Sequence, residues 1–368
     1  MIKDVSSKTS KGKMLEGKRI LVTGGTGSMG KTFIRRLLSG EHGNPEKVVV
    51  MSRDEGKQHD MRLEFMNMDE QTHEVAYNNF RRALAFRIGD VRNYDDVSAA
   101  VRDMDIVINA AALKQVPICE YFPHQAVLTN CIGAENITRA CAEAKCTVET
   151  VVGISTDKAV HPINVMGMTK SLQERIFIAG NLQDNDTRYV CVRYGNVLAS
   201  RGSVIPLFLQ LIENNRPLTL THKDMTRFLI SLDQAVDTVF AALANAKPGE
   251  IFVPDAPSAT MENVAKAMIG SRNLEIKVIG IRPGEKMHEI MVSEEEAWRV
   301  RRAGDFYAVA PMLPELVPDM SVYANSPLTK EFSSGDTVLN FQQTVDLLAK
   351  HSLLPGMDNK QGLSEILR

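Results

Sequence analysis

The sequence predicts a doubly wound parallel α/β sheet that carries a smaller C-terminal α/β lobe for substrate binding. Short apolar runs alternate with helical patterns through residues 18–194, and a glycine-rich turn separates the first run from the first helix. Alternating strands and helices need crossover connections, which produce a parallel sheet covered by helices on both faces. A chain of 368 residues is long enough for such a sheet and an attached lobe.

The elements of the first half can be recognised in chain order. Residues 1–17 form a flexible polar lead-in, and the apolar run that begins at Lys18 ends in glycine, as a buried strand does. Apolar residues then recur at helical spacing in Lys31–Leu38. The elements expected after it are strands at Lys47–Met51, Ala85–Ile88, Ile106–Asn109 and Val148–Ser155, and a helix at Ala134–Ala144.

The second half, residues 195–354, is richer in proline, glycine and arginine and alternates less regularly. We interpret it as a lobe, interleaved with the sheet, that closes over a second ligand. Residues 66–84 read as a polar insertion and residues 355–368 as a loose tail.

Composition excludes several classes of protein. A net charge of −2 with 44% apolar residues argues against disorder and against a surface for nucleic acid. The polar segment Met1–Lys13 has no apolar signal core, and no apolar run is long enough to span a membrane, so a cytoplasmic location without membrane contact is expected. Five cysteines without CxxC spacing predict reduced thiols, and the histidines show no metal-ligand spacing, so no metal is expected.

The turn after the first strand predicts a dinucleotide site. Gly24, Gly27 and Gly30 let the backbone turn tightly and approach a pyrophosphate, which the N-terminus of the following helix attracts. A glycine triplet alone is weak evidence, but its place between strand and helix favours this Rossmann interpretation. The residues predicted to bind the cofactor are Gly24, Thr26, Gly27, Ser28, Met29, Gly30, Ser52, Arg53, Asp90, Val91, Ala110, Ala111 and Ala112.

The end of the second strand favours NADP over NAD. It carries Ser52 and Arg53 where an acidic residue would bind a free ribose 2′-hydroxyl, and a hydroxyl with a guanidinium suits a 2′-phosphate. Asp90 follows the third strand, where an adenine amino group would be met. The small side chains of 110–112 let the cofactor lie close to the backbone.

The fifth strand is expected to end in a polar group, Thr156, Asp157 and Lys158. Met166 and Lys170 follow on one face of the next helix, four residues apart. In a short-chain dehydrogenase that face carries a tyrosine base and a lysine that binds the nicotinamide ribose. Methionine, which cannot transfer a proton, stands here at the tyrosine position.

The chain resembles the UDP-N-acetylglucosamine 4,6-dehydratases of capsule, O-antigen and flagellin-glycan synthesis, which are extended short-chain dehydrogenases/reductases of the polysaccharide biosynthesis protein family. The resemblance extends from about residue 17 to about residue 305, and capsule-type members share the methionine. Its strings are Thr23-Gly-Gly-Thr-Gly-Ser, Ser52-Arg-Asp-Glu, Ala110-Ala-Ala-Leu-Lys-Gln-Val-Pro, Ser155-Thr-Asp-Lys, Arg193-Tyr-Gly-Asn-Val, Ser200-Arg-Gly-Ser-Val and Arg282-Pro-Gly-Glu-Lys.

The resemblance implies a dehydration in which hydride leaves sugar carbon 4 for NADP and returns to carbon 6. Lys158, with a pKa lowered by burial and by the cofactor, is the candidate base for the carbon-5 proton. Asp157, protonated in a dry site, would donate to the leaving 6-hydroxyl. Thr156 would orient the 4-hydroxyl, whose proton Asp157 accepts in place of the missing tyrosine. Lys170 would hold the nicotinamide ribose.

The resemblance also implies a site for UDP-N-acetylglucosamine. Arginines suit its diphosphate because they offer several donors in a fixed fork. The residues assigned to substrate are Lys114, Asn130, Asn196, Arg201, Arg227, Arg282 and Glu285, and Asn130 is alternatively a structural support for the helix of Lys170.

Two other functions remain open on sequence. A UDP-sugar 4-epimerase or reductase would use the same scaffold, but it would need the tyrosine and has no use for an Asp-Lys pair at carbon 6. A non-catalytic nucleotide-binding module would explain the lost tyrosine, although the pair at 157–158 opposes it. Relatives form dimers or hexamers, so we expect a homo-oligomer, with residues 134–144 or 171–180 as candidate interfaces. Inversion at carbon 5 is expected.

Overall fold

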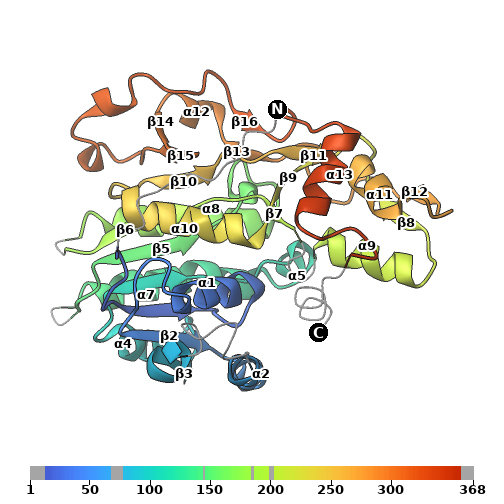
Figure 1. The fold of residues 1–368 in the computed structure, drawn as a ribbon. Coiled ribbons are helices and arrows are strands. Elements are labelled where there is room, and N and C mark those ends of the chain that lie inside the picture. Colours follow the sequence, from blue (N-terminus) through green and yellow to red (C-terminus); the bar gives the residue numbers. More distant parts are fainter. Residues whose placement is uncertain (1–12, 68–77, 144–145, 184–185, 199–202, 358–368) are drawn as a thin grey trace.

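The computed structural model describes residues 13–67, 78–143, 146–183, 186–198 and 203–357. A large sheet forms its centre (Figure 1). The parallel strands of this sheet are β1 (Arg19–Thr23), β2 (Lys47–Ser52), β3 (Leu84–Ile88), β4 (Ile106–Asn109), β5 (Thr150–Ile154), β6 (Arg188–Val192) and β10 (Ile251–Pro254). Two antiparallel strands, β14 (Val300–Ala303) and β15 (Phe306–Val309), extend one edge.

The strand order is β14-β15-β10-β6-β5-β4-β1-β2-β3 in this nine-stranded sheet. From β1 the chain first adds β2 and β3 on one side and then adds β4, β5 and β6 on the other side, which is the doubly wound topology. The predicted fold class is therefore confirmed. Strands such as β4 and β5 are buried at every position because helices cover both faces, and this explains their continuous apolar runs.

Helices form a layer on each face of the sheet (Figure 1). One layer contains the packed pair α1 (Ser28–Leu38) and α10 (Leu232–Asn245). The other contains α4 (Tyr94–Val101), α7 (Gly133–Cys141) and α8 (Val165–Gly180), in contact in that order. The helix α2 (Glu55–Met66) is capped at its N-terminus by Asp54, whose side chain accepts a hydrogen bond from the Lys57 amide.

The segment before α7 is helical for longer than the sequence pattern indicates. The short helices α5 (Val116–Tyr121) and α6 (Pro123–Ala126) lead into one π-helical stretch at Val127–Ile132. A π-helix carries an extra residue per turn and commonly marks a functional site. Here it places Asn130 toward α8, as described below.

The second half also forms small sheets and helices beyond the main sheet, some at the right of Figure 1 and some along its top. Part of this region, with Leu198, Phe208, Val264 and Leu348, has a core of its own. Met291, Val292 and Phe332, in contrast, belong to the core around the main sheet. These small sheets and helices comprise the strands β7 (Asn196–Val197), β8 (Leu218–Leu220), β9 (Thr226–Ile230), β11 (Ser258–Thr260), β12 (Ile276–Val278), β13 (Ile290–Val292) and β16 (Phe332–Ser333), and the helices α9 (Val204–Glu213), α11 (Met261–Ile269), α12 (Glu294–Ala297) and α13 (Phe341–Lys350).

The predicted segment boundaries need one correction. Residues 13–17 are not a loose part of the lead-in, because Leu15 is fully buried in the main core and its amide donates to the carbonyl of His42. Residues 1–12, residues 68–77 of the predicted insertion and residues 358–368 of the predicted tail lie outside the described part of the chain. A boundary at 194/195 stays a prediction, since β10, β14 and β15 come from the second half yet complete the main sheet.

The register of the strands aligns the candidate site residues. Thr23 at the end of β1 pairs with Asn109 at the end of β4, and Asn109 pairs with Gly153 near the end of β5. Consequently the loops that follow β1, β2, β4, β5 and β6 all leave the same edge of the sheet. Ligands of doubly wound folds bind at this edge.

Candidate functional site

The glycine turn is shaped so that only glycine fits at two of its positions. Gly24 has φ +66°, and a Cβ there would lie 2.7 Å from the Ala111 Cα. A Cβ on Gly30 would lie 2.5 Å from the Gly25 Cα. The turn therefore packs closely against the residues that follow β4. Gly27 is the N-cap residue of α1 and has no side chain to cap it, so the N–H groups of the first helical turn are available to an anion.

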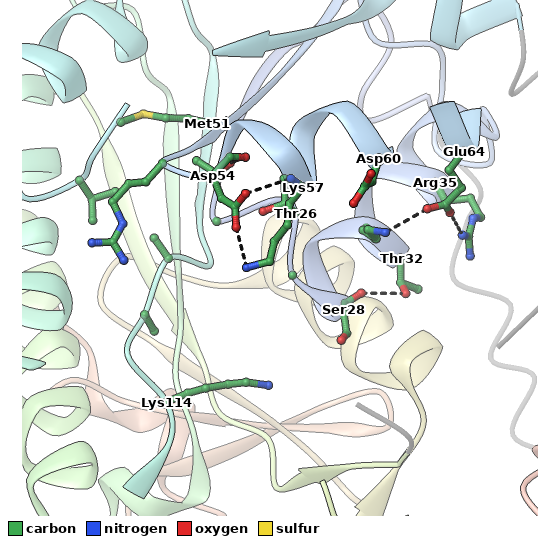
Figure 2. A pocket seen from close by; sticks show the side chains of 18 of the residues that line it. Thr26, Ser28, Thr32, Arg35, Met51, Asp54, Lys57, Asp60, Glu64 and Lys114 are labelled. Atoms are coloured by element: carbon green, nitrogen blue, oxygen red, sulfur yellow. Dashed lines mark hydrogen bonds and ion pairs between the residues drawn. The ribbon is translucent and has the colours of Figure 1, made fainter. Parts of the chain in front are cut away.

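A cavity of about 1670 Å³ opens at this turn (Figure 2). Its volume accommodates a dinucleotide, whose pyrophosphate would lie at the N-terminus of α1. The predicted cofactor residues that line it are Gly24, Thr26, Gly27, Ser28, Ser52, Arg53, Asp90, Val91, Ala111 and Ala112, whereas Met29, Gly30, Ala110 and Lys170 are not among its described lining residues. The glycine cradle and this lining fit the predicted cofactor.

Charged residues of α1 and α2 also line this cavity, and sequence reasoning had not singled them out. Lys31 and Arg35 both pair with Glu64, at 3.0 and 2.6 Å. Lys57 pairs with Asp54 at 2.9 Å, and Figure 2 shows these side chains at the α2 end of the cavity. The helical spacing could not predict that these residues line a cavity, because a charged residue on a helix usually faces solvent.

Asp90 is held by arginines. Arg92 donates to its carboxylate at 2.6 and 2.8 Å, and Arg53 lies 3.7 Å away. Burial raises the pKa of Asp90, but the hydrogen bonds from the Arg92 side chain and backbone and the charge of Arg53 lower it overall. The carboxylate is therefore ionised and able to accept from an amino group.

The helix face at the tyrosine position is buried. Met166 packs in a small apolar cluster with Cys119 and Ala126. The Lys170 ammonium donates to the carbonyl of Ile154 at 2.5 Å and to the Gln173 side chain at 2.7 Å. Burial lowers the pKa of Lys170 to about 8, so this lysine loses its proton far more readily than an exposed lysine but is still mostly charged at pH 7.

Asp157 and Lys158 lie in a short 3₁₀ turn directly after β5, as the strand pattern predicted. Asp157 is fully buried and its Oδ1 accepts from the Thr156 hydroxyl at 2.8 Å and from the Lys158 ammonium at 3.1 Å. The ammonium also lies 3.3 Å from Glu289 and 3.4 Å from the Asn196 side-chain oxygen. One lysine therefore stands between two buried carboxylates.

The expectation of a lowered Lys158 pKa is wrong for the free protein. Burial does lower it, but the charges of Asp157 and Glu289 outweigh burial and raise the pKa above its usual value. Two neighbouring carboxylates stabilise the ammonium, which makes it the resting form. In addition, neither Asp157 nor Lys158 is among the described residues that line the large cavity.

Asn130 has a structural role. Its side chain accepts from the Leu113 amide at 2.8 Å and donates to the Leu113 carbonyl at 3.0 Å and to Thr169 at 2.9 Å. It thereby ties the loop after β4 to α8, which supports the structural alternative raised from sequence. Lys114, in contrast, lines the cavity. Figure 2 shows it at some distance from Asp54 and Lys57.

The residues predicted to bind the uridine diphosphate are only partly brought together. Asn196 reaches Lys158, and Arg227 lies 3.9 Å from Glu289 while it donates to the Thr226 carbonyl at 2.7 Å. The Arg282 residue is exposed, and Glu285 carries a buried oxygen without a hydrogen-bond partner among the described residues. Arg201 lies outside the described residues.

Sequence reasoning missed a buried ionic network behind the 3₁₀ turn. Arg193 forms paired hydrogen bonds with Glu174 of α8 and with Glu296 of α12, all between 2.7 and 2.9 Å. Ser155, next to Thr156, donates to Glu174 at 2.5 Å. An arginine within an otherwise apolar strand end was the available signal, since buried arginine requires partners.

Within the described residues there is no group of three or more His, Cys, Asp or Glu side chains able to hold a metal ion. The same part of the chain contains no helix with the length and apolar character needed to cross a membrane. His161 pairs with Glu295 and His288 with Thr226.

Comparison with known proteins gives one family and several similar chains. A family model described as polysaccharide biosynthesis protein matches residues 20–311. A UDP-glucose 4-epimerase of Rickettsia bellii is 45% identical over 80% of this chain and 84% of the relative. One of Rickettsia felis is 44% identical with the same coverage.

Solved structures agree on the fold. The X-ray structure of Pen from Bacillus thuringiensis has a TM-score of 0.81 and 32% identity and covers 92% of this chain and 99% of its own. DesIV, a dTDP-glucose 4,6-dehydratase from Streptomyces venezuelae with NAD bound, has a TM-score of 0.61 at 19% identity, covering 73% and 86%. The latter likeness concerns the fold alone.

Proposed function

The chain belongs to the polysaccharide biosynthesis protein family, and from this membership we propose that it is an enzyme that modifies a nucleotide sugar. Its reaction is the dehydration of UDP-N-acetylglucosamine to a UDP-2-acetamido-2,6-dideoxy-4-hexulose for surface glycan synthesis. Hydride moves internally from carbon 4 to carbon 6, so the enzyme is a lyase without net redox change. Carbon 5 is inverted in the product.

The observation that carries this proposal is the contact between the buried Asp157 and the partly exposed Lys158 at the carboxyl end of β5. The pair is a carboxylate and an amine 3.1 Å apart, at the sheet edge from which the glycine turn also leaves. Dehydration at carbons 5 and 6 needs a base and an acid side by side. A 4-epimerase transfers a proton only at the 4-hydroxyl and needs neither group at carbons 5 and 6.

NADP is the proposed cofactor, in preference to NAD. The glycine turn would hold its pyrophosphate, Ser52 and Arg53 its 2′-phosphate and Asp90 its adenine. Lys170 would turn from the Ile154 carbonyl to the nicotinamide ribose. When bound, the cofactor would supply the acceptor and donor of hydride.

The chain's own residues would move the protons. Thr156 orients the sugar 4-hydroxyl, and Asp157 accepts its proton. Lys158, once neutral, removes the proton from carbon 5, and Asp157 then donates to the departing 6-hydroxyl. Met166 contributes shape but no proton, because a thioether has none to exchange.

For the UDP group we propose Asn196, Arg227, Arg282, Glu285 and Arg201, with Lys114 near the sugar or the diphosphate. Arginine provides parallel donors for phosphate oxygens. Asn196 and Arg227 adjoin the Asp157–Lys158 pair, so nucleotide binding would position the sugar at it.

We further propose a homo-oligomer in the cytoplasm. Met168 and Leu172 on α8 are each about half exposed and lie one turn apart on that helix, which suits helix pairing between copies. The alternative stretch at 134–144 is less suitable, because most of α7 is buried against the sheet.

A UDP-sugar 4-epimerase is the second candidate, and the Rickettsia relatives named UDP-glucose 4-epimerase favour it. The two reactions differ in product mass, since dehydration removes one water and epimerisation removes none. Epimerisation on this chain would also have to proceed with Met166 at the tyrosine position.

The deciding experiment is incubation of the purified chain with UDP-N-acetylglucosamine in deuterated water, followed by NMR and mass spectrometry. We expect loss of one water, a 4-ketone, and deuterium at carbon 5. An isomer of unchanged mass would establish the epimerase instead, and the same incubation with UDP-glucose would identify its substrate.

A further inference from the structure

Glu289 is a buried carboxylate for which sequence reasoning gave no role. Only 3% of its surface is exposed, and its backbone is clamped by Ser334, which donates to its carbonyl and accepts from its amide. Its Oε1 lies 3.3 Å from the Lys158 ammonium. The contact is therefore one between a buried carboxylate, held by two backbone hydrogen bonds, and the ammonium.

The charged groups that face Lys158 come from four segments. Asp157 is on its own turn, Glu289 precedes β13, Arg227 is on β9, and Lys286 follows the loop at 280–285. Asn196 on β7 completes the surroundings with a neutral oxygen. The ammonium therefore has two carboxylates as direct partners, while the charges of Arg227 and Lys286 oppose it.

One oxygen of each carboxylate is buried without a hydrogen-bond partner among the described residues, namely Oδ2 of Asp157 and Oε2 of Glu289. Such an oxygen is costly when charged and is satisfied once it carries a proton or meets a hydroxyl group. Asp157 already accepts two hydrogen bonds at Oδ1, from Thr156 and Lys158. Glu289 has the ammonium and a cation 3.9 Å away.

We propose that Glu289 accepts the proton of Lys158 when the sugar covers the site, and so converts the lysine into a base. This role rests on the proposed dehydration. Glu289 is a positioning residue that acts through Lys158 and does not touch the sugar. It resolves the conflict between a charged resting lysine and a reaction that needs a neutral amine.

The trigger is loss of water. The Lys158 side chain is 23% exposed in the free protein. A sugar lying over it removes that hydration, and a dry environment favours a neutral amine with a neutral acid over an ammonium with a carboxylate. Of the two carboxylates Glu289 gives up fewer hydrogen bonds on protonation, so Asp157 stays available for the 4-hydroxyl.

The protons balance over one turnover. The N–H bond of Lys158 breaks as an O–H bond forms on Glu289. Asp157 takes the 4-hydroxyl proton and passes it to the 6-hydroxyl, which leaves as water, while Lys158 takes the carbon-5 proton. Carbon 5 then regains a proton from solvent on its opposite face. Lys158 is left as the ammonium, and Glu289 returns to the carboxylate by releasing its proton to solvent.

Diphosphate binding would assist this transfer. Arg227 lies 3.9 Å from Glu289 in the free protein. A bound diphosphate would engage that guanidinium and weaken its hold on Glu289. Binding of the nucleotide and activation of the base are thus coupled.

The test compares wild type with Glu289→Gln and Glu289→Asp on UDP-N-acetylglucosamine between about pH 7 and about pH 10. A glutamine cannot take the proton, so Lys158 must lose it to solvent. We expect kcat of Glu289→Gln to fall about 100-fold at pH 7 and the deficit to shrink below about tenfold near pH 10, with little change in KM. Glu289→Asp should restore part of kcat.

Glu250→Gln is the matched control. Glu250 is fully buried and pairs with Arg301 at 2.6 Å, and it lies before β10, away from the carboxyl ends of the strands. It reports the effect of losing a buried carboxylate without changing Lys158. A deficit in Glu289→Gln that is equal at every pH, or one confined to KM, would overturn the proposal.

A second measurement does not depend on turnover. Competitive acetylation of Lys158 with acetic anhydride, followed across pH by peptide mass spectrometry, reports the fraction of neutral amine in the free enzyme. We expect the Lys158 midpoint to move to lower pH in Glu289→Gln. An unchanged midpoint would show that the two groups do not interact in the free enzyme and would overturn the proposal. If wild type forms no dehydrated product while the midpoint moves, the proposed function fails and the Glu289–Lys158 coupling stands.

Discussion

At the scale of single residues, the site is governed by which charges are buried together. Asp157 has no exposed surface, and its Oδ1 accepts hydrogen bonds from both the Thr156 hydroxyl and the Lys158 ammonium. A buried carboxylate keeps its charge only with such partners. Its position directly after β5 could be predicted from the strand pattern, because polar residues after a buried strand reach the ligand edge.

Replacing Asp157 with Asn tests its place in the reaction. The amide retains the size of the side chain but can neither take nor give the proton, so we expect kcat to fall by about 10²–10⁴-fold. Bound cofactor, measured by absorbance after gel filtration, should remain. Asp255→Asn, which alters a surface pair with Arg302, serves as control; full activity of Asp157→Asn would remove Asp157 from the mechanism.

Lys170 makes stability depend on pH at the alkaline end. Burial lowers its pKa to about 8 from an unfolded value near 10.5, so the unfolded chain binds the extra proton between these values and stability rises with pH there. The cost of burying the ammonium, on the order of 3 kcal/mol, is present in full below about pH 8. We expect Lys170→Met to be more stable than wild type at pH 7, with the difference in Tm narrowing toward pH 10.5. A difference in Tm that stays constant over this range would contradict a lowered pKa of Lys170.

At the scale of elements, tight packing at the turn from β1 to α1 sets the approach to the cavity. The glycine pattern identified this turn, whereas it could not reveal which glycine meets which atom. Gly24 meets Ala111 of the loop after β4, far away in sequence, and Gly30 meets Gly25 of its own turn. Contacts of the first kind arise only when the sheet has formed.

Gly30→Ala and Gly27→Ala form a matched pair. Alanine usually stabilises a helix, but at position 30 its Cβ would lie 2.5 Å from backbone, whereas at position 27 the nearest atom is 3.5 Å away. We expect Gly30→Ala to lose about 1–3 kcal/mol and several degrees of Tm without any cofactor present, and Gly27→Ala to change little. Equal Tm values for the two variants, measured by calorimetry, would show that the turn relaxes easily.

The elements that sequence reasoning placed least well are those fixed by distant contacts. The π-helical stretch at 127–132 depends on Asn130 reaching Leu113 and Thr169. Likewise Glu289 follows an irregular segment, and only folding brings it to Lys158. The spacing of apolar residues predicts the type of element and its buried face, but it does not predict which polar groups meet across the core.

At the scale of the whole molecule, Arg193 joins parts that are far apart in the chain. It lies after β6, Glu174 belongs to α8 and Glu296 to α12, and all three are buried. Because removing one partner leaves an uncompensated buried charge, breaking such a triad typically costs about 3–5 kcal/mol. The network therefore holds the end of β6, α8 and α12 together next to the 3₁₀ turn that carries Asp157.

Glu296 makes stability depend on pH at the acidic end. Burial raises its pKa, but the charge and hydrogen bonds of Arg193 outweigh burial and lower it to about 2. A lowered folded value means that this stabilisation is present above the unfolded pKa of about 4.5 and is lost as pH falls toward 2. We expect Glu296→Gln to unfold at lower temperature than wild type at pH 7 and the two Tm values to converge below about pH 3. Glu295→Gln, on the exposed side of α12, is the control.

The sheet is completed late in the chain, because β6 ends at Val192 whereas its neighbour β10 begins at Ile251. A ribosome must therefore make about 60 further residues, roughly 3–12 s of synthesis at common rates, before that edge can close. During this interval the newly made chain exposes the unpaired edge of the apolar strand β6. Slow decoding between these two points, or loss of trigger-type chaperones, should consequently lower the soluble yield more than the same delay after residue 309.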